Sequence, residues 1–223
     1  MSLQDKLDAF KADFMAGKPP YNAPPDIHPI MTRATDELIA SGQANDAINV
    51  GDRAPEFLLK DQNGNEVSSQ ALLAKGPLVV TFYRGVWCPY CNMELAAINE
   101  VLPQIQALGG NLVAISPQTQ ANSRKSVRTG ELNFPVLSDV KGEIGDAFGL
   151  RFQLPDYLID LYGMFKNDLP LINDDPSWTL PMPARYVIGQ DGIVLYAEVN
   201  PDYTQRPDPS ELLPVLEKAA SSR

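Results

Sequence analysis

The stretch that indicates the fold is Tyr83-Arg84-Gly85-Val86-Trp87-Cys88-Pro89-Tyr90-Cys91, which separates two segments of different periodicity. Residues 78–83 form a short run of apolar, β-branched and aromatic side chains, typical of a strand buried on both faces. After this stretch, apolar residues recur at helical spacing at Leu95, Ile98, Leu102 and Ile105. The two cysteines therefore stand where a buried strand passes into a helix, and open α/β sheets present their reactive groups at such junctions.

The spacing of the two cysteines favours redox chemistry. Cys88 falls at the start of the predicted helix, where unpaired N–H groups and the helix dipole lower the pKa of a thiol. Pro89 occupies the first helical position, where its missing N–H costs nothing. Cys91 follows one turn later, about 5–6 Å away and within disulfide range. We expect Cys88 to be an exposed nucleophile and Cys91 its resolving thiol, rather than two core cysteines that meet by chance.

Composition excludes several classes of function. The chain has 223 residues, which suits one domain with an appendage, and its formal net charge is -10. This charge argues against nucleic acid and against an anionic membrane surface as the main partner. One histidine, His28, excludes a two-histidine metal site, and two cysteines exclude a zinc site or a disulfide-stapled scaffold. No glycine spacing or other motif indicates a nucleotide, flavin or haem, so no cofactor and no metal are expected.

Residues 1–47 are predicted to form an N-terminal helical extension. A first helix has Leu3, Leu7, Phe10 and Phe14 on one face, and a second spans about 30–41. A proline-rich connector joins them, and we interpret His28 as a loop residue within it. Two such helices cannot bury their apolar faces alone, so we expect them to pack on the main domain or on a second subunit. With no apolar leader and no transmembrane run, the sequence predicts a cytoplasmic protein.

Residues 48–223 are predicted to form the main domain. Asn63-Gly64 and Asp191-Gly192 are hairpin turns by composition. Elements after residue 75 follow the order β-α-β-α-β-α-β-β-α, which predicts an α/β (α+β) fold with a central mixed sheet and helices on both faces. Residues 150–182 are interpreted as an irregular insert, whose aromatic residues form core or a wall for an organic hydroperoxide or partner peptide.

The main domain resembles the thioredoxin-like peroxiredoxin family, also called alkyl hydroperoxide reductase/thiol-specific antioxidant. The resemblance extends over about residues 48–220 and is strongest with a peroxiredoxin-like branch that carries C-x-x-C. The stretches that carry it are Val50–Phe57, Trp87–Cys91, Phe134–Asp139, Pro183–Ile188 and Asp191-Gly192.

This family implies a thioredoxin-like fold and the reduction of hydrogen peroxide or organic hydroperoxides by a cysteine that becomes a sulfenic acid. By position, Cys88 is the peroxidatic residue and Cys91 takes the resolving role. A thioredoxin- or glutathione-type reductant restores the pair. Relatives in this family often dimerise, and the N-terminal helices could provide a homodimer contact.

The sequence departs from the family pattern P-x-x-x-T/S-x-x-C. Thr81 stands at the proline position and Gly85 at the hydroxyl position, so the hydroxyl that would bind peroxide oxygen is missing. Four supporting residues are predicted. Arg84 and Arg185 are candidate activating cations, Pro183 is the candidate cis-proline of a thioredoxin fold, and Trp87 is a lid or packing group beside Cys88.

Residues 202–206 resemble a signature of the same branch. We interpret this segment as a loop anchored by Tyr203, with a functional role for Arg206 as the lesser alternative.

Two other functions remain open at this point. Cys88-Pro89-Tyr90-Cys91 is the tetrapeptide of glutaredoxins, which favours a dithiol-disulfide oxidoreductase acting on protein or glutathione disulfides. Alternatively, the N-terminal helices and the insert dock a partner, and the cysteine pair acts as a non-enzymatic redox sensor. Turnover separates these readings, because a sensor reacts once whereas an enzyme cycles with its reductant.

Overall fold

The structure, a computed structural model, describes residues 1–221. Its α-helices are α1 (Leu3–Met15), α2 (Ile27–Ser41), α3 (Ser69–Leu73), α4 (Pro89–Ala107), α5 (Gln120–Gly130), α6 (Glu143–Ala147), α7 (Asp156–Met164), α8 (Leu169–Asn173) and α9 (Leu212–Ser221). Its strands are β1 (Leu58–Lys60), β2 (Glu66–Ser68), β3 (Leu78–Phe82), β4 (Asn111–Ser116), β5 (Val136–Ser138), β6 (Arg151–Gln153), β7 (Thr179–Pro181), β8 (Ala184–Ile188) and β9 (Val194–Val199). Two 3₁₀ turns, η1 (Gln43–Asp46) and η2 (Pro209–Glu211), complete the elements.

A seven-stranded mixed sheet forms the centre, in the order β2-β1-β5-β4-β3-β8-β9. Strands β3, β4 and β5 are parallel, and β8 pairs with β3 antiparallel, with Val80 opposite Tyr186. Every residue of β3 is buried, as expected for an apolar strand with covered faces. The chain leaves β3 near the middle of the sheet, and this position places the cysteine loop at the carboxyl edge of the parallel strands.

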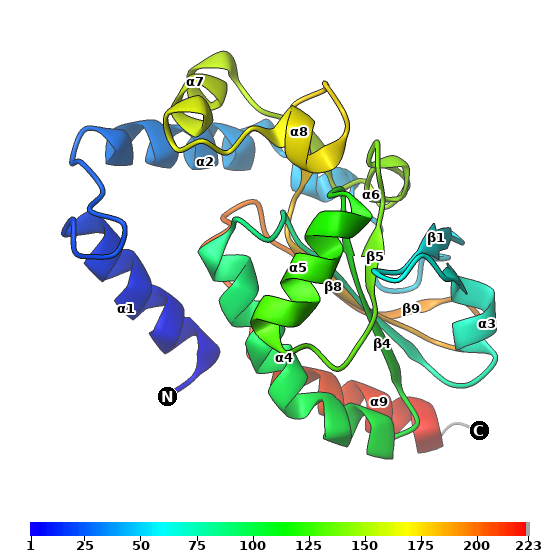
Figure 1. The fold of residues 1–223 in the computed structure, drawn as a ribbon. Coiled ribbons are helices and arrows are strands. Elements are labelled where there is room, and N and C mark those ends of the chain that lie inside the picture. The colour runs from blue at the N-terminus through cyan, green and yellow to red at the C-terminus, as the bar shows by residue number, and fades with distance from the viewer. Residues whose placement is uncertain (222–223) are drawn as a thin grey trace.

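Helices cover both faces of the sheet, which confirms the predicted fold class (Figure 1). Alternate residues of β3 face opposite sides, because successive side chains of a strand point to opposite faces. Val79 packs with Leu95 and Ile98 of α4 and with Leu216 of α9. On the other side, Val80 and Phe82 pack in a core that includes the buried residues Phe148, Leu150, Tyr186 and Ile188.

The N-terminal extension packs against the rest of the chain. Helix α1 begins with a capping box between Ser2 and Asp5, and it buries Leu3 and Leu7 in the same core as α4. Helix α2 lies along α7 (Figure 1). It begins at Ile27, earlier than expected, so His28 belongs to its first turn and not to a loop. The ring centroid of His28 lies 5.7 Å from that of Phe14 on α1.

The prediction of an irregular segment at residues 150–182 is wrong. Strands β6 and β7 form a two-stranded antiparallel sheet, with Phe152 opposite Leu180, and α7 and α8 lie between them. The prolines that suggested irregular structure stand at helix starts. Pro155 precedes α7 and Pro170 lies in the first turn of α8, where a missing N–H leaves no hydrogen bond unmade. Within residues 1–221, no helix combines the length and apolar character needed to span a bilayer.

Candidate active site

The loop between β3 and α4 is held by polar side chains beneath it. Gln118 accepts a hydrogen bond from the Val86 N–H at 2.9 Å and donates to the buried Tyr83 hydroxyl at 2.7 Å. Asn92, in the first turn of α4, donates to the Val86 carbonyl at 2.8 Å. The side chains of Gln118 and Asn92 therefore hold the loop at Val86, two residues before Cys88.

Cys88 and Cys91 are both free thiols in direct contact. Cys88 is the N-cap residue of α4, with Pro89 in the first turn, as the sequence predicts. The Cys91 thiol donates a hydrogen bond to Cys88 Sγ, with the sulfurs 2.8 Å apart. A disulfide needs a sulfur separation of about 2.0 Å, so the pair can close with a small side-chain movement.

The structure contradicts the expected exposure of Cys88. Cys88 is 1% exposed and Cys91 0% exposed. The N-terminal extension packs beside the cysteine loop, since the ring of Phe10 on α1 contacts that of Tyr90, two residues after Cys88, edge-to-face with centroids 5.0 Å apart. Cys88 and Phe10 both line a cavity beside this contact.

The two thiols have opposite proton affinities. Burial raises the pKa of Cys88, but the hydrogen bond from Cys91, the Arg84 charge and the Cys91 backbone N–H outweigh burial and bring the pKa to about 6. The charge of Arg206 acts in the same direction. For Cys91, burial and the neighbouring Cys88 thiolate raise the pKa well above its ordinary value. Near neutral pH, Cys88 is the thiolate and Cys91 the thiol that stabilises it.

Arg84 lies in the same cavity as Cys88. Its guanidinium is 4.1 Å from the Tyr203 ring centroid and 4.9 Å from that of Trp87, and it donates to the Tyr162 hydroxyl. Arg84 is buried, and such a cation is screened little by water. The placement fits the predicted activating role of Arg84, and the Tyr203 ring lies against its guanidinium.

Arg185 is directed to another partner. Its side chain is 0% exposed and donates to Glu94 at 2.8 Å, whereas Arg206 donates to the other oxygen of Glu94 at 2.5 Å. Arg206 Nη2 also lies 4.0 Å from Cys91 Sγ. The second cation beside the thiols is therefore Arg206, the residue that sequence reasoning rated as the lesser candidate.

Glu94 was missed by sequence reasoning, although a signal was present. It lies three residues after Cys91 on the apolar face of α4, where a carboxylate is not expected without partners. A second acid, Glu198, stands opposite Arg185 on β9. Burial and the nearby Glu94 charge raise the pKa of Glu198 to about 7.

Pro183 does not have the predicted geometry. Its peptide bond is trans, since the cis peptide bond among residues 1–221 is Pro19-Pro20. The Pro183 carbonyl accepts a hydrogen bond from the Asn200 N–H at 3.1 Å and so continues the pairing of β8 with β9. This use in the sheet replaces the expected role of Pro183 as a cis-proline beside the thiols.

A cavity of about 370 Å³ adjoins Cys88. The extension contributes aromatic and apolar walls, among them Phe10, Phe14, Tyr21, Pro24 and Met31. The cysteine loop contributes Arg84, Trp87 and Cys88, and the insert contributes Tyr162 and Phe165. Its volume is within the usual range for small-molecule sites. Together with Tyr203, four segments that are distant in sequence thus enclose a mostly apolar space whose reactive group is Cys88.

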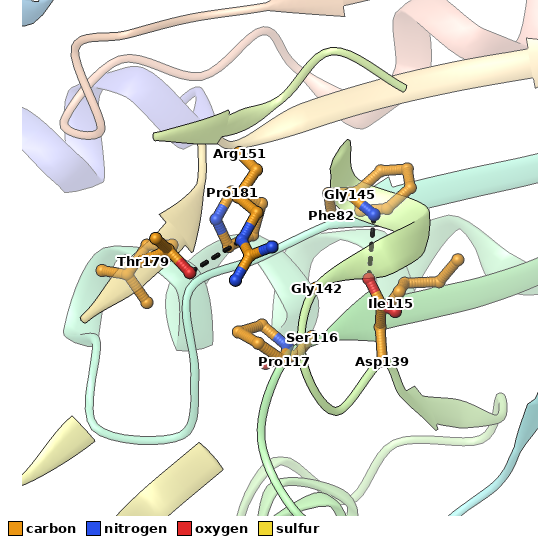
Figure 2. Close-up of a pocket in the computed structure, with 11 residues that line it drawn as sticks. Phe82, Ile115, Ser116, Pro117, Asp139, Gly142, Gly145, Arg151, Thr179 and Pro181 are labelled. Carbon is orange, nitrogen blue, oxygen red and sulfur yellow. Dashed lines mark hydrogen bonds between the residues drawn. The ribbon is translucent and has the colours of Figure 1, made fainter. Parts of the chain in front are cut away.

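A second cavity, at the carboxyl ends of β3 and β4, is much smaller (Figure 2). Its volume is about 10 Å³, barely that of one water. Two of its polar pairs are hydrogen-bonded, since Arg151 donates to Thr179 at 2.8 Å and Gly145 N–H donates to Asp139 at 2.8 Å (Figure 2), whereas the buried Ser116 hydroxyl has no partner among residues 1–221. Its volume alone makes this cavity too small for an organic substrate.

The sequence profile of the AhpC/TSA family matches residues 50–197. The chain belongs to this family. The resemblance inferred from Trp87–Cys91 and the flanking stretches is thereby confirmed. The match includes the cysteine loop and the sheet, whereas the N-terminal extension lies outside it.

Relatives of this family member include both peroxiredoxins and disulfide oxidoreductases. It is 31% identical over 121 residues to the thiol-disulfide oxidoreductase ResA of Geobacillus thermodenitrificans, covering 54% of this chain and 68% of the relative. It is 26% identical over 153 residues to the chloroplastic peroxiredoxin Q of Oryza sativa, covering 69% of this chain and 60% of that protein. Among solved structures, peroxidoxin BcpB of Mycobacterium tuberculosis superposes with a TM-score of 0.61 at 21% identity, covering 79% of this chain and 99% of that one. The structural match confirms the thioredoxin-like fold.

Proposed function

We propose that this protein is a thiol peroxidase in which Cys88 reduces hydroperoxides and Cys91 resolves the product. The observation that carries the proposal is the thiol pair itself. Cys88 has a pKa of about 6 and receives a hydrogen bond from Cys91 at 2.8 Å, inside a cavity with Arg84. Family membership supports the same chemistry.

The reaction uses two thiols and one hydroperoxide. The Cys88 thiolate attacks the terminal oxygen of ROOH, the O–O bond breaks, and the alkoxide takes up the proton that the thiol had lost. Cys88 is now a sulfenic acid. Cys91 sulfur then attacks Cys88 Sγ, forming the disulfide and releasing water. A dithiol reductant of the thioredoxin or glutathione type reduces this disulfide and returns both thiols.

The cavity supports hydroperoxides with an apolar body as substrates alongside hydrogen peroxide. Its aromatic walls, such as Phe10 and Phe165, offer an organic substituent an apolar surface that hydrogen peroxide does not use. Because Cys88 is 1% exposed, a substrate must fit inside the cavity to react.

A dithiol-disulfide oxidoreductase is the second candidate function. It is favoured by the match to ResA and by the C-x-x-C pair at the start of α4. The burial of Cys88 disfavours it, since a protein disulfide must reach the attacking sulfur before exchange can begin. A homodimer and a cytoplasmic location stay predictions.

The deciding experiment is rapid mixing of the reduced protein with cumene hydroperoxide, followed by mass spectrometry of Cys88. We expect oxidation at least about 100-fold faster than that of a free low-molecular-weight thiol, with loss of this reaction in Cys88→Ser. Cys91→Ser is the matched variant, because it should retain the first step and stop at the sulfenic acid.

Three outcomes distinguish the candidate functions. Rapid oxidation with repeated turnover upon addition of thioredoxin supports the peroxidase. A rate equal to that of the free thiol, with rapid reduction of insulin or of glutathione mixed disulfides, supports the oxidoreductase instead. One rapid oxidation that no dithiol reductant reverses supports the sensor.

A further inference from the structure

The indole of Trp87 occupies the space of the family's missing hydroxyl side chain. Gly85 stands at the hydroxyl position, and a Cβ atom on it would lie 2.5 Å from Trp87 Nε1 and 2.9 Å from Cδ1. These distances are far below van der Waals contact, so a side chain at 85 and the observed indole exclude each other. Gly85 also has φ +150°, a conformation that other residues rarely adopt. The ring nitrogen of Trp87 thus lies 2.5 Å from the point where a threonine side chain would begin.

This nitrogen is an enclosed donor without an acceptor. Among residues 1–221, none accepts a hydrogen bond from Trp87 Nε1 or from Arg84 Nε, although both atoms are buried. Buried donors in proteins are nearly always hydrogen-bonded. The two groups cannot satisfy each other, because the indole N–H and the guanidinium N–H groups are all donors.

Both unpartnered donors belong to residues that line the cavity with Cys88. Trp87 and Arg84 are stacked there, with the guanidinium carbon 4.9 Å from the indole ring centroid. The other walls are largely aromatic and apolar and include Phe10 and Tyr162. No described residue supplies an acceptor for these N–H groups, and an oxygen of a hydroperoxide bound in the cavity has the right chemistry.

We propose that the Trp87 indole N–H is the oxygen-binding donor of this peroxidase and takes the place of the absent hydroxyl at position 85. It donates to the departing oxygen of ROOH while the Cys88 thiolate attacks the terminal oxygen. Both electrons of the O–O bond go to the departing oxygen, whose negative charge the N–H stabilises without losing its proton. Arg84 supplies the second donor. This inference rests on the proposed peroxidase function.

The test replaces the N–H and leaves the ring. In one variant, Trp87 becomes β-(3-benzothienyl)alanine, in which sulfur stands where indole has N–H. The matched control carries the same replacement at Trp178, which packs in the core cluster around α7 and does not line the cavity. Cys88 oxidation by cumene hydroperoxide and Cys88 alkylation by iodoacetamide are measured on both.

We expect the Trp87 replacement to slow the peroxide reaction by about 100-fold, as when an enzyme loses one donor to a developing oxyanion. Alkylation has no departing oxygen, so its rate and pH midpoint should not change. Trp87→Phe should behave in the same way, and it serves as a second variant if the first does not fold. The Trp178 replacement should leave both rates unchanged.

Two results would overturn the inference. A peroxide rate within about threefold of the wild type would show that no N–H is needed. An equal fall in peroxide and alkylation rates would assign Trp87 a structural role only. Failure of the proposed function is separate, since the unmodified protein would then oxidise no faster than a free thiol.

Discussion

Replacing Arg84 by glutamine should raise the pKa of the Cys88 thiol and thereby move the pH at which the protein becomes reactive. Arg84 shares a cavity with Cys88, and its charge contributes to the lowering of the Cys88 pKa. The hydrogen bond from Cys91 and the charge of Arg206 remain in the variant. An opposite charge within a few ångströms lowers a pKa by about 1–3, so removing one of several favourable contributions should move the midpoint from about 6 to about 7–8.

The consequence for the reaction rate can be worked out directly. The folded pKa is depressed, so the thiolate is present above the midpoint and lost as the pH falls through it. At pH 6 the wild type is about half thiolate, whereas the variant would hold about 1–10%. Alkylation at pH 6 should therefore slow by about 5- to 50-fold, while at pH 9 the two proteins should react within about twofold of each other.

The assay is the alkylation of Cys88 by iodoacetamide between pH 4 and 10, with the modified cysteine identified by mass spectrometry. Cys91 should remain unmodified below pH 8, because its pKa is raised. Arg84→Lys is the control, since it retains the positive charge, and its midpoint should stay close to the wild-type value. A midpoint near 6 in Arg84→Gln would refute the assignment of Arg84 as an activating cation.

Three further predictions concern stability and substrate choice. Glu198 has its folded pKa raised to about 7, so its contribution to stability is full below the unfolded pKa and is lost as the pH rises through 7. In urea unfolding, the free energy of unfolding of Glu198→Gln relative to that of the wild type should be about 2 kcal/mol higher at pH 9 than at pH 5, a value that allows for the partial exposure of Glu198. The same relative stability at both pH values would contradict this prediction. Gly85→Ala should cost about 1–3 kcal/mol in the same assay, because the new methyl group displaces the Trp87 indole; an unaltered indole fluorescence spectrum would argue against that contact. Phe10→Ala should slow oxidation of Cys88 by cumene hydroperoxide about tenfold and leave hydrogen peroxide within about twofold, whereas equal effects would show that the extension does not select the substrate.

Local patterns predicted much of the fold. The buried strand at 78–82, the helix that begins at Pro89 and the contact of Cys88 with Cys91 all depend on neighbouring residues. The hairpin turns were also predictable from the sequence. Gly64 and Gly192 adopt the positive φ that the Asn-Gly and Asp-Gly pairs indicate.

Contacts between residues far apart in the chain could not be predicted from the sequence in the same way. Arg206 reaches Cys91 across 115 residues, and nothing in the spacing distinguishes it from Arg185. Periodicity placed Phe10 and Phe14 on one helix face but not over the cysteine loop, and so Cys88 was expected to be exposed. Proline composition around 150–182 was ambiguous, because prolines end some elements and begin others.

The contact between Arg206 and Cys91 makes the acidity of Cys88 depend on the order in which the chain folds. Residues 84–91 leave the ribosome together, so Arg84 and both cysteines are neighbours early, but the segment with Arg206 emerges 115 residues after Cys91. Strand β8, which pairs with β3 to complete the centre of the sheet, also comes late, and closing so long a loop slows its pairing. A nascent Cys88 therefore lacks one of its two cations and the enclosing walls, so its pKa lies above the value in the folded protein. The rate of Cys88 alkylation near pH 6 should therefore increase when the Arg206 segment docks beside the thiols.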